Sequence, residues 1–239
     1  MDFPGHIAEV SILLNLQKEI ESFENNRYAS NILQWFKSKG CDSPAYYKNV
    51  FTNSYKFIGK NRDPNYSGPG IIVYKSQNLY KKAYIGNFQM GKRQGRGFRL
   101  VKDKLYSGYY NEDIKHGDAE IWDVSSHDPV LTFRGKFKHG VMNGECYVKD
   151  YKHKFNGMMR DGLYHGRCKI KYQNGDYFEG EMEDGEMNGE GRIMYSNGDV
   201  YEGVLRDNQI TGQGKYIWKS QMMNGEDEVD DSHRHFWNN

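Results

Sequence analysis

The chain lacks the features that mark disulfide-stabilised, secreted or membrane-spanning proteins. Its three cysteines, Cys41, Cys146 and Cys168 among 239 residues, form an odd, sparse set that is typical of a reducing compartment. No run of about 18 apolar residues is present, so no membrane-spanning helix is expected. The N-terminus opens with an acidic residue, and polar residues interrupt its apolar stretch, so we predict no signal peptide. These absences predict a soluble, cytoplasmic protein.

An excess of charge of one sign is also missing. The formal net charge is only +1, which implies no bulk attraction to nucleic acid. Apolar residues make up 37% of the chain, a low share for a compact domain, yet it holds 27 glycines, 19 tyrosines, 12 phenylalanines and 4 tryptophans. So many aromatic residues exclude simple disorder, and the glycines must therefore serve a fold.

Glycines and aromatic residues keep a fixed register over seven units. If the first aromatic of a unit is position 0, glycine follows at positions 2 and 11 in every unit. Position 4 is apolar in six of the seven units, position 7 holds a turn-forming residue, and position 13 is small. A register shared by seven units indicates an internal repeat rather than a linker. The units start at Phe57, Tyr84, Tyr106, Phe133, Phe155, Phe178 and Tyr201.

The pattern within each unit predicts one β-hairpin. Alternation of aromatic, glycine and apolar residues is typical of a half-buried strand, which is followed by a turn and a return strand. We expect Asn143-Gly144 and Asn188-Gly189 to form turns within hairpins, and Asn174-Gly175 and Asn197-Gly198 to form turns between them. Glycine at position 2 predicts the close approach of an aromatic ring from a neighbouring unit. The fold class expected is mainly β, an elongated single-layer antiparallel ribbon of about seven hairpins.

The repeat resembles the MORN repeat (membrane occupation and recognition nexus). The segments "YIGNFQMGKRQGRG" (84–97) and "FEGEMEDGEMNGEG" (178–191) match the family pattern almost fully, and the resemblance extends over about 57–219. Two longer spacings between units predict insertions near 79–83 and 125–130. The departures from the pattern are Asn61, Pro64, Asp113, Ala119, Cys146, Cys168 and Asn208.

The flanks differ from the repeats, which we place at 54–219. Residues 1–53 contain apolar residues at helical spacing and predict short α-helices that either cap the first strand or dock a partner. Residues 220–239 form an acidic tail that we expect to be flexible. Its Phe236 and Trp237 suit either a short docking motif or folding back onto the ribbon.

No catalytic, cofactor-binding or metal-binding site is predicted. The Gly-x-Gly strings recur in the repeat register and lack the lysine of a phosphate loop. Cys146 and Cys168 occupy the same slot in adjacent hairpins, about 10 Å apart, too far for a disulfide and long for sharing a metal ion. We interpret them as small residues that replace glycine, and we expect no enzymatic activity.

Charge is unevenly distributed along the repeats. Residues 134–172 hold ten Lys and Arg against three acids, whereas 176–190 hold seven acids and no base. This pattern suits either charge balance on solvated strands or a polarised surface that orients a partner or meets anionic lipid. The candidate anionic-surface contacts are Lys92, Arg93, Arg96, Lys136, Lys138, Lys152 and Lys154.

The resemblance implies a scaffold or adaptor that binds a peptide or helix along an aromatic-lined groove within a multi-protein complex. Similar MORN proteins occur in radial spokes and other axonemal parts of cilia and flagella, so a cytoskeletal location is expected. Binding of acidic phospholipid, or service as a non-catalytic subunit of a larger enzyme or membrane complex, is the alternative. The partner-binding candidates are Tyr84, Phe88, Tyr106, Tyr110, Phe133, Phe137, Phe155, Met159, Phe178, Met182 and Tyr201.

Overall fold

A computed structural model describes residues 38–39, 50–51, 55–59, 65–76 and 79–220. The chain divides into two compact units, Met1–Leu131 and Thr132–Asn239, and each is described by itself. The helices expected within 1–53, apart from 38–39, lie outside the described residues. The same holds for Cys41 and for Phe236 and Trp237 in the acidic tail.

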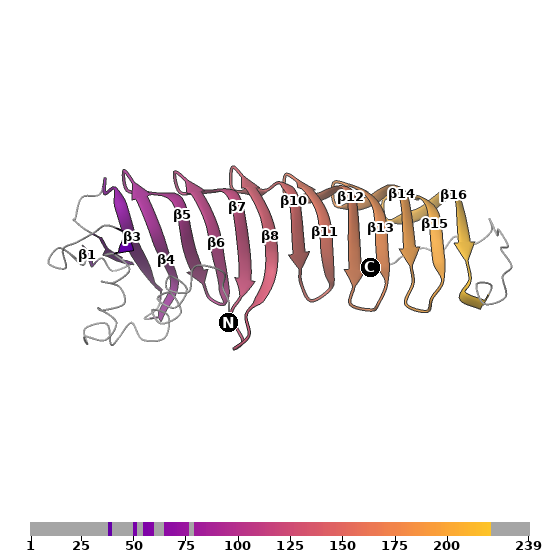
Figure 1. Cartoon of the computed structure of the whole chain (residues 1–239), viewed down its shortest axis with the longest axis horizontal. Coiled ribbons are helices and arrows are strands. Elements are labelled where there is room, and N and C mark those ends of the chain that lie inside the picture. Colours follow the sequence, from indigo (N-terminus) through magenta and orange to yellow (C-terminus); the bar gives the residue numbers. More distant parts are fainter. Residues whose placement is uncertain (1–37, 40–49, 52–54, 60–64, 77–78, 221–239) are drawn as a thin grey trace. The chain divides into compact units, whose positions relative to one another are not determined.

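The first unit is an antiparallel sheet whose strands are hydrogen-bonded in chain order (Figure 1). A short strand, β1, precedes the first predicted repeat and was not expected. The strands are β1 (Val50–Phe51), β2 (Tyr55–Ile58), β3 (Gly68–Ser76), β4 (Leu79–Gln89), β5 (Lys92–Val101), β6 (Lys104–Asn111) and β7 (Ile114–Asp123).

The second unit repeats this arrangement, except that β9 pairs with β8 alone and lies off the path from β8 to β10. The predicted antiparallel, mainly β fold is confirmed. Each predicted position-0 residue lies in the first strand of a hairpin, for example Phe178 in β13 and Tyr201 in β15. The strands are β8 (Val130–Lys138), β9 (Val141–Met142), β10 (Gly144–Lys149), β11 (His153–Arg160), β12 (Leu163–Tyr172), β13 (Tyr177–Glu183), β14 (Glu186–Met194), β15 (Val200–Arg206) and β16 (Gln209–Ile217).

The turns within hairpins lie at positions 6 and 7, so the prediction for Asn143-Gly144 and Asn188-Gly189 was wrong. Asp161 and Gly162, for example, have φ of 51° and 84°, the two consecutive positive values of a type I′ turn. Gly189 instead lies inside β14 with φ of 106°, where the pairing of β13 with β14 shifts register. A bulge and a tight turn both favour glycine because both need positive φ, so the dipeptide alone could not separate them.

The connections between hairpins agree better with prediction. Asn174-Gly175 and Asn197-Gly198 are turns, closed by bonds from Gly175 N to Tyr172 O (3.2 Å) and from Gly198 N to Tyr195 O (2.9 Å). The insertion expected near 125–130 is the loop between β7 and β8. The insertion expected at 79–83 is instead part of strand β4, because the β3–β4 connection extends the two strands rather than adding a loop.

Glycine is required at position 2 because an aromatic ring lies on it, and that ring belongs to the same unit rather than to a neighbour. A Cβ added at Gly180 would lie 2.7 Å from Phe178 Cζ, and one added at Gly191 would lie 2.7 Å from Phe178 Cε2. Real Cβ atoms do not approach this closely. The small residue at position 13 therefore completes a flat seat for the ring at position 0.

Candidate partner-binding groove

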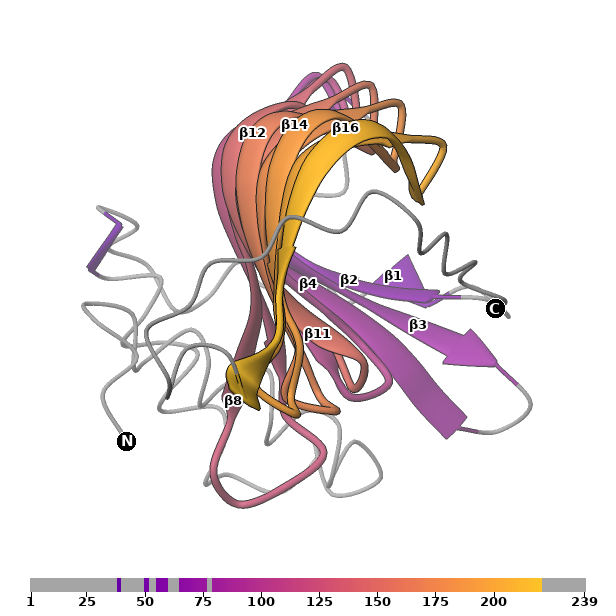
Figure 2. The same cartoon turned by 90° about the vertical axis from the view of Figure 1, so that its right-hand side faces the viewer.

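Three parallel rows of side chains cross one face of the sheet within each unit, which we call the inner face. The first row alternates position 0 with position 15, as in Phe155–Ile170–Phe178–Ile193. The second is the row of small residues at positions 2 and 13. The third joins position 4 to position 9, as in Met182 with Met187. Strands β12, β14 and β16 are strongly bowed (Figure 2), and such curvature lets inner-face side chains converge and bury one another.

All eleven predicted partner-binding residues lie in these rows and are buried. None is more than 7% exposed, and Tyr84, Phe155 and Phe178 are 0% exposed. Their burial gives them a packing role, because they form the hydrophobic core of a sheet that has no second layer among the described residues. Partner contact by these residues stays a prediction, and the side chains above them offer more surface.

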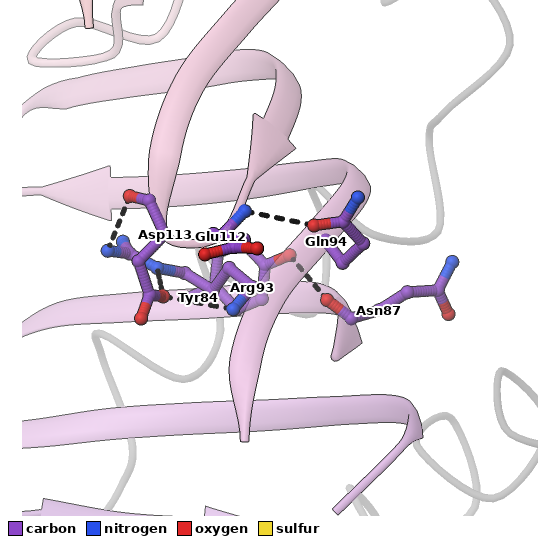
Figure 3. Close-up of polar contacts among 6 residues, drawn as sticks. All are labelled: Tyr84, Asn87, Arg93, Gln94, Glu112 and Asp113. Atoms are coloured by element: carbon purple, nitrogen blue, oxygen red, sulfur yellow. Dashed lines mark hydrogen bonds and ion pairs between the residues drawn. The ribbon is translucent and has the colours of Figure 1, made fainter. Parts of the chain in front are cut away.

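The tyrosine hydroxyls at position 0 are used locally. Tyr106 donates to the carbonyl of Tyr109 (2.9 Å) and Tyr201 to that of Val204 (3.0 Å). Tyr84 donates to Asn87 O at 3.2 Å (Figure 3). Each hydroxyl bonds to a backbone carbonyl three residues later in its own strand. Because this bond stays within one strand, phenylalanine, which lacks the hydroxyl, can occupy the same position in other repeats. The phenol therefore anchors the ring on its glycines.

A groove opens above the core of the second unit. Position 9 is half-buried there: Tyr164 stacks on Phe155 with ring centroids 3.8 Å apart, and Met187 lies one hairpin further on. The neighbouring hollow has a volume of about 670 Å³. Apolar side chains on its floor and polar groups along its sides are typical of binding sites. The lining residues are Lys152, Tyr172, Gln173, Asn174, Asp176, Phe178, Met187, Ile193 and Asn208.

Buried carboxylates hold one turn to the next beside this groove. Asp176, only 5% exposed, accepts a hydrogen bond from Asn174 Nδ2 (2.7 Å) and another from Ser196 N of the following turn (2.7 Å). Asp199 repeats the arrangement with Lys219 N at 2.9 Å. In the sequence, Asp176 stood out only as part of an acidic run. The recurring Asn-Gly-Asp triplet is the signal that could have identified it.

Side chains at the hairpin turns likewise form hydrogen bonds to the preceding hairpin. Asn208 Oδ1 accepts from Met187 N (2.9 Å), and Asp113 Oδ1 accepts from the Arg93 backbone N (2.9 Å) and from its Nε (2.7 Å). Figure 3 shows the latter pair, beside the bond from Glu112 N to the Gln94 side chain. Asp113 and Asn208 depart from the family glycine, and their side chains add bonds that glycine cannot make.

The inner face of the first unit carries cations where the second unit is apolar. Position 9 is Arg93 and Lys115, and position 15 includes Arg99. The Arg93 guanidinium lies 4.8 Å from the Tyr110 ring centroid, and Lys115 Nζ lies 4.5 Å from that of Tyr106. The sequence patterns did not point to Lys115, and Arg99 stood out only as one member of the basic stretch 84–104. Aligning positions 9 and 15 across the units would have found them, since the second unit has Met142, Tyr164, Met187 and Ile210 at position 9 and Val148, Ile170, Ile193 and Tyr216 at position 15.

The predicted basic residues do not form one cluster. Arg93 lies on the inner face of the first unit, where its side chain is 16% exposed. Lys152 lines the hollow of the second unit. Lys92 pairs with Glu112 at 2.9 Å and is 51% exposed. Outer-face charges also pair across the acidic boundary, as in Lys169 with Glu179 at 3.4 Å. The remaining predicted residues, Arg96, Lys136, Lys138, Lys152 and Lys154, are exposed.

Cys146 and Cys168 lie in the row of small residues, as predicted. Both are buried free thiols, and a Cβ added at Gly157 would lie 2.5 Å from the Cβ of Cys168. Burial raises the pKa of Cys146 to about 11 and that of Cys168 to about 12. At neutral pH these thiols are therefore unreactive small residues rather than nucleophiles.

Within the described part of the chain, no three His, Cys, Asp or Glu residues gather closely enough to hold a metal ion. The same residues include no helix of the length and apolarity needed to cross a membrane.

Comparison with protein families matches the MORN repeat at residues 84–100, 155–177, 178–200 and 201–223. The chain is a MORN-repeat protein. The matched segments begin at position 0 of four of the seven hairpins, so the family register and the strand pairing agree. Repeats of this family are non-catalytic binding modules. A search of curated proteins finds no significant match.

Proposed function

We propose that this MORN-repeat protein is a non-catalytic scaffold or adaptor that binds a segment of another protein along its inner face. The observation that carries the proposal is the groove of the second unit, with apolar Met187 and Ile193 beside Phe178 and polar groups at its rim. A hollow of about 670 Å³ suits several side chains of a helix or an extended peptide. Non-catalytic binding is also what the repeat family provides.

A cytoplasmic, cytoskeletal location, in a cilium or flagellum or a comparable assembly, is part of the proposal. It is supported by the family resemblance alone, so the experiment must identify the partner rather than assume it.

Site-specific photo-crosslinking tests the groove. Benzoylphenylalanine at Tyr164, half-buried on the inner face, should crosslink to a defined segment of a protein in extracts of cells that express the chain. The same probe at Lys169, exposed on the outer face, is the matched control. Met187→Glu should abolish the inner crosslink because it places a charge on an apolar floor. Crosslinks only from Lys169, or undiminished crosslinking by the Met187 variant, would refute groove binding.

Binding of acidic phospholipid is the second candidate, and the outer face supports it. Lys136, Lys138 and Lys154 are exposed on β8 and β11, and Arg167 and Lys171 are exposed on β12. Such a surface attracts anionic headgroups by about 1 kcal/mol per basic residue. Flotation with vesicles containing phosphatidylserine should then fall sharply in a Lys136→Glu, Lys154→Glu variant. Unchanged flotation would exclude this candidate.

A further inference from the structure

Three cations share the inner face of the first unit. Arg99 on β5 faces Tyr84 on β4 and Tyr106 on β6 in the strand register, while Lys115 faces Tyr110. Burial, together with the charges of Arg99 and Arg93, lowers the pKa of Lys115. The three side chains are therefore within electrostatic reach of one another, in slots that the second unit fills with apolar residues or tyrosine.

Two polar atoms of this cluster, on Arg99 and Tyr110, lack a hydrogen-bond partner among the described residues. Arg93 already donates to Asp113 through its backbone N, its Nε and one terminal guanidinium nitrogen. Arg99 Nε, by contrast, is buried and has no hydrogen-bond partner among the described residues. The hydroxyl oxygen of Tyr110, a side chain only 2% exposed, is likewise buried and makes no hydrogen bond of good geometry within them. Arg93 and Arg99 lie close enough to this hydroxyl to oppose the rise in its pKa that burial causes. A donor that is buried without an acceptor is unfavourable, because it has lost its hydrogen bond to water. An anionic ligand that supplies the missing acceptor would offset this cost.

We propose that Arg93, Arg99, Lys115 and the Tyr110 hydroxyl form a site for the carboxylate of an acidic residue carried by the bound protein segment. The inference rests on the proposed function and adds a required chemistry to it. Guanidinium groups bind carboxylates through paired N–H donors, and the Tyr110 hydroxyl adds another donor. A segment that binds the inner face of the first unit must therefore present an acidic side chain.

The placement of the cluster favours a protein segment over a membrane. A bilayer surface meets basic side chains that project from a protein, and Lys92, 51% exposed, is of that kind. Arg93, at 16% exposure, instead lies low on the inner face against the Tyr84 and Tyr110 rings. A side chain that enters from a segment lying along the face can reach it there.

Substitutions taken from the other repeats test the site without disturbing the fold. Arg99→Ile and Lys115→Met place in positions 15 and 9 the residues found there in the second unit. Full-length protein carrying both should unfold at the same or a higher urea concentration than the wild type, because apolar residues of similar size replace partly buried charges. Marked destabilisation would show that the cations serve the fold, and would overturn the proposal.

Binding is measured by fluorescence polarisation with a fluorescein-labelled peptide of ten glutamates, with ten glutamines as the neutral probe. The wild type should bind the glutamate peptide, and the double variant should bind it at least tenfold more weakly. Lys149→Gln with Lys154→Gln, which removes the same number of charges from the second unit, should change the affinity less than twofold. Equal losses in both variants, or no preference for glutamate, would refute a specific carboxylate site.

Two further results separate this inference from the proposed function. If the Tyr164 crosslink to a partner forms in the wild type while the wild type shows no preference for the glutamate peptide over the glutamine peptide, the groove function stands and the carboxylate site fails. If the double variant loses binding to phosphatidylserine vesicles but keeps the glutamate peptide, the cluster recognises a lipid headgroup and the proposal is wrong.

Discussion

The row of small residues allows one sharp prediction about why glycine recurs at position 2. Gly157 does not adopt the left-handed conformation, so alanine is permitted there by the backbone. Reducing the conformational freedom of the unfolded chain would by itself stabilise Gly157→Ala by about 0.4–1 kcal/mol. The added methyl group, however, would lie 2.5 Å from the Cβ of Cys168 and 2.9 Å from Phe155 Cζ. Overpacking of this kind costs about 1–3 kcal/mol, so a net loss of about 1–2 kcal/mol is expected.

Removing the Cys168 side chain while adding a methyl group at position 157 should recover part of the lost stability. Cys168→Gly alone is expected to cost about 1 kcal/mol, because it removes a buried side chain and places glycine in a strand. In the double variant, Gly157→Ala with Cys168→Gly, the Cβ–Cβ clash is gone. The combined loss should therefore be smaller than the sum of the single losses by about 1 kcal/mol or more.

Urea denaturation of the full chain, followed by far-ultraviolet circular dichroism, measures the free energy of unfolding of the wild type, the two single variants and the double variant. Cys146→Gly is the matched control: it removes the same thiol from the adjacent hairpin, where the Cys146 Cβ would lie 2.7 Å from a Cβ at Gly135. It should rescue Gly135→Ala better than it rescues Gly157→Ala. A wild-type stability for Gly157→Ala, or strictly additive losses, would show that ring seating is not the reason for the glycines.

Three further predictions concern the second unit. Asp176→Ala should lower the free energy of unfolding by about 1–3 kcal/mol, since it leaves Ser196 N without its acceptor. Substitution of an exposed acid, Glu190→Ala, should change that free energy by less than about 0.5 kcal/mol. Equal effects of the two variants in urea denaturation would contradict a stabilising role for the bond between Asp176 and Ser196. Burial raises the pKa of Tyr164 to about 12, so the stabilisation from its neutral phenol is fully present below the ordinary tyrosine pKa of about 10 and is lost as pH rises through the folded value. Phenolate absorbance at 295 nm, measured near pH 10.5, should be nearly the same for folded wild type and Tyr164→Phe. After unfolding it should differ by about three-quarters of one phenolate, because the ordinary tyrosine pKa is about 10; a difference of that size in the folded proteins would oppose this. Cys168, whose pKa is raised to about 12, should react with a disulfide reagent at pH 8 only as fast as the protein opens. Because the chain also holds Cys41 and Cys146, the labelled site is located by mass spectrometry, and rapid labelling of Cys168 itself in the folded protein would disprove its burial.

The sequence alone determined the repeat, its register and the antiparallel hairpins. Hydrophobic alternation has a period of two in a strand, and glycine that recurs in step with it marks turns, bulges and close approaches, so local pattern was sufficient. It also identified Cys146 and Cys168 as replacements for glycine. The positions of turns within hairpins were harder to predict, because Gly189 satisfies a bulge with the same positive φ that a turn requires.

Only the tertiary structure decided which residues are open to a partner. Phe178 and its equivalents are conspicuous in the sequence, yet they are buried by packing on Gly180 and Gly191. The surface above them comes from positions 9 and 15, whose residue types vary and carry no motif. Arg93 and Arg99 lie on β5 and Lys115 lies on β7, at spacings that form no sequence motif. The pairing of β4 to β7 brings the three cations onto one face. Pairing decides this because strand register, unlike sequence spacing, sets which side chains are neighbours.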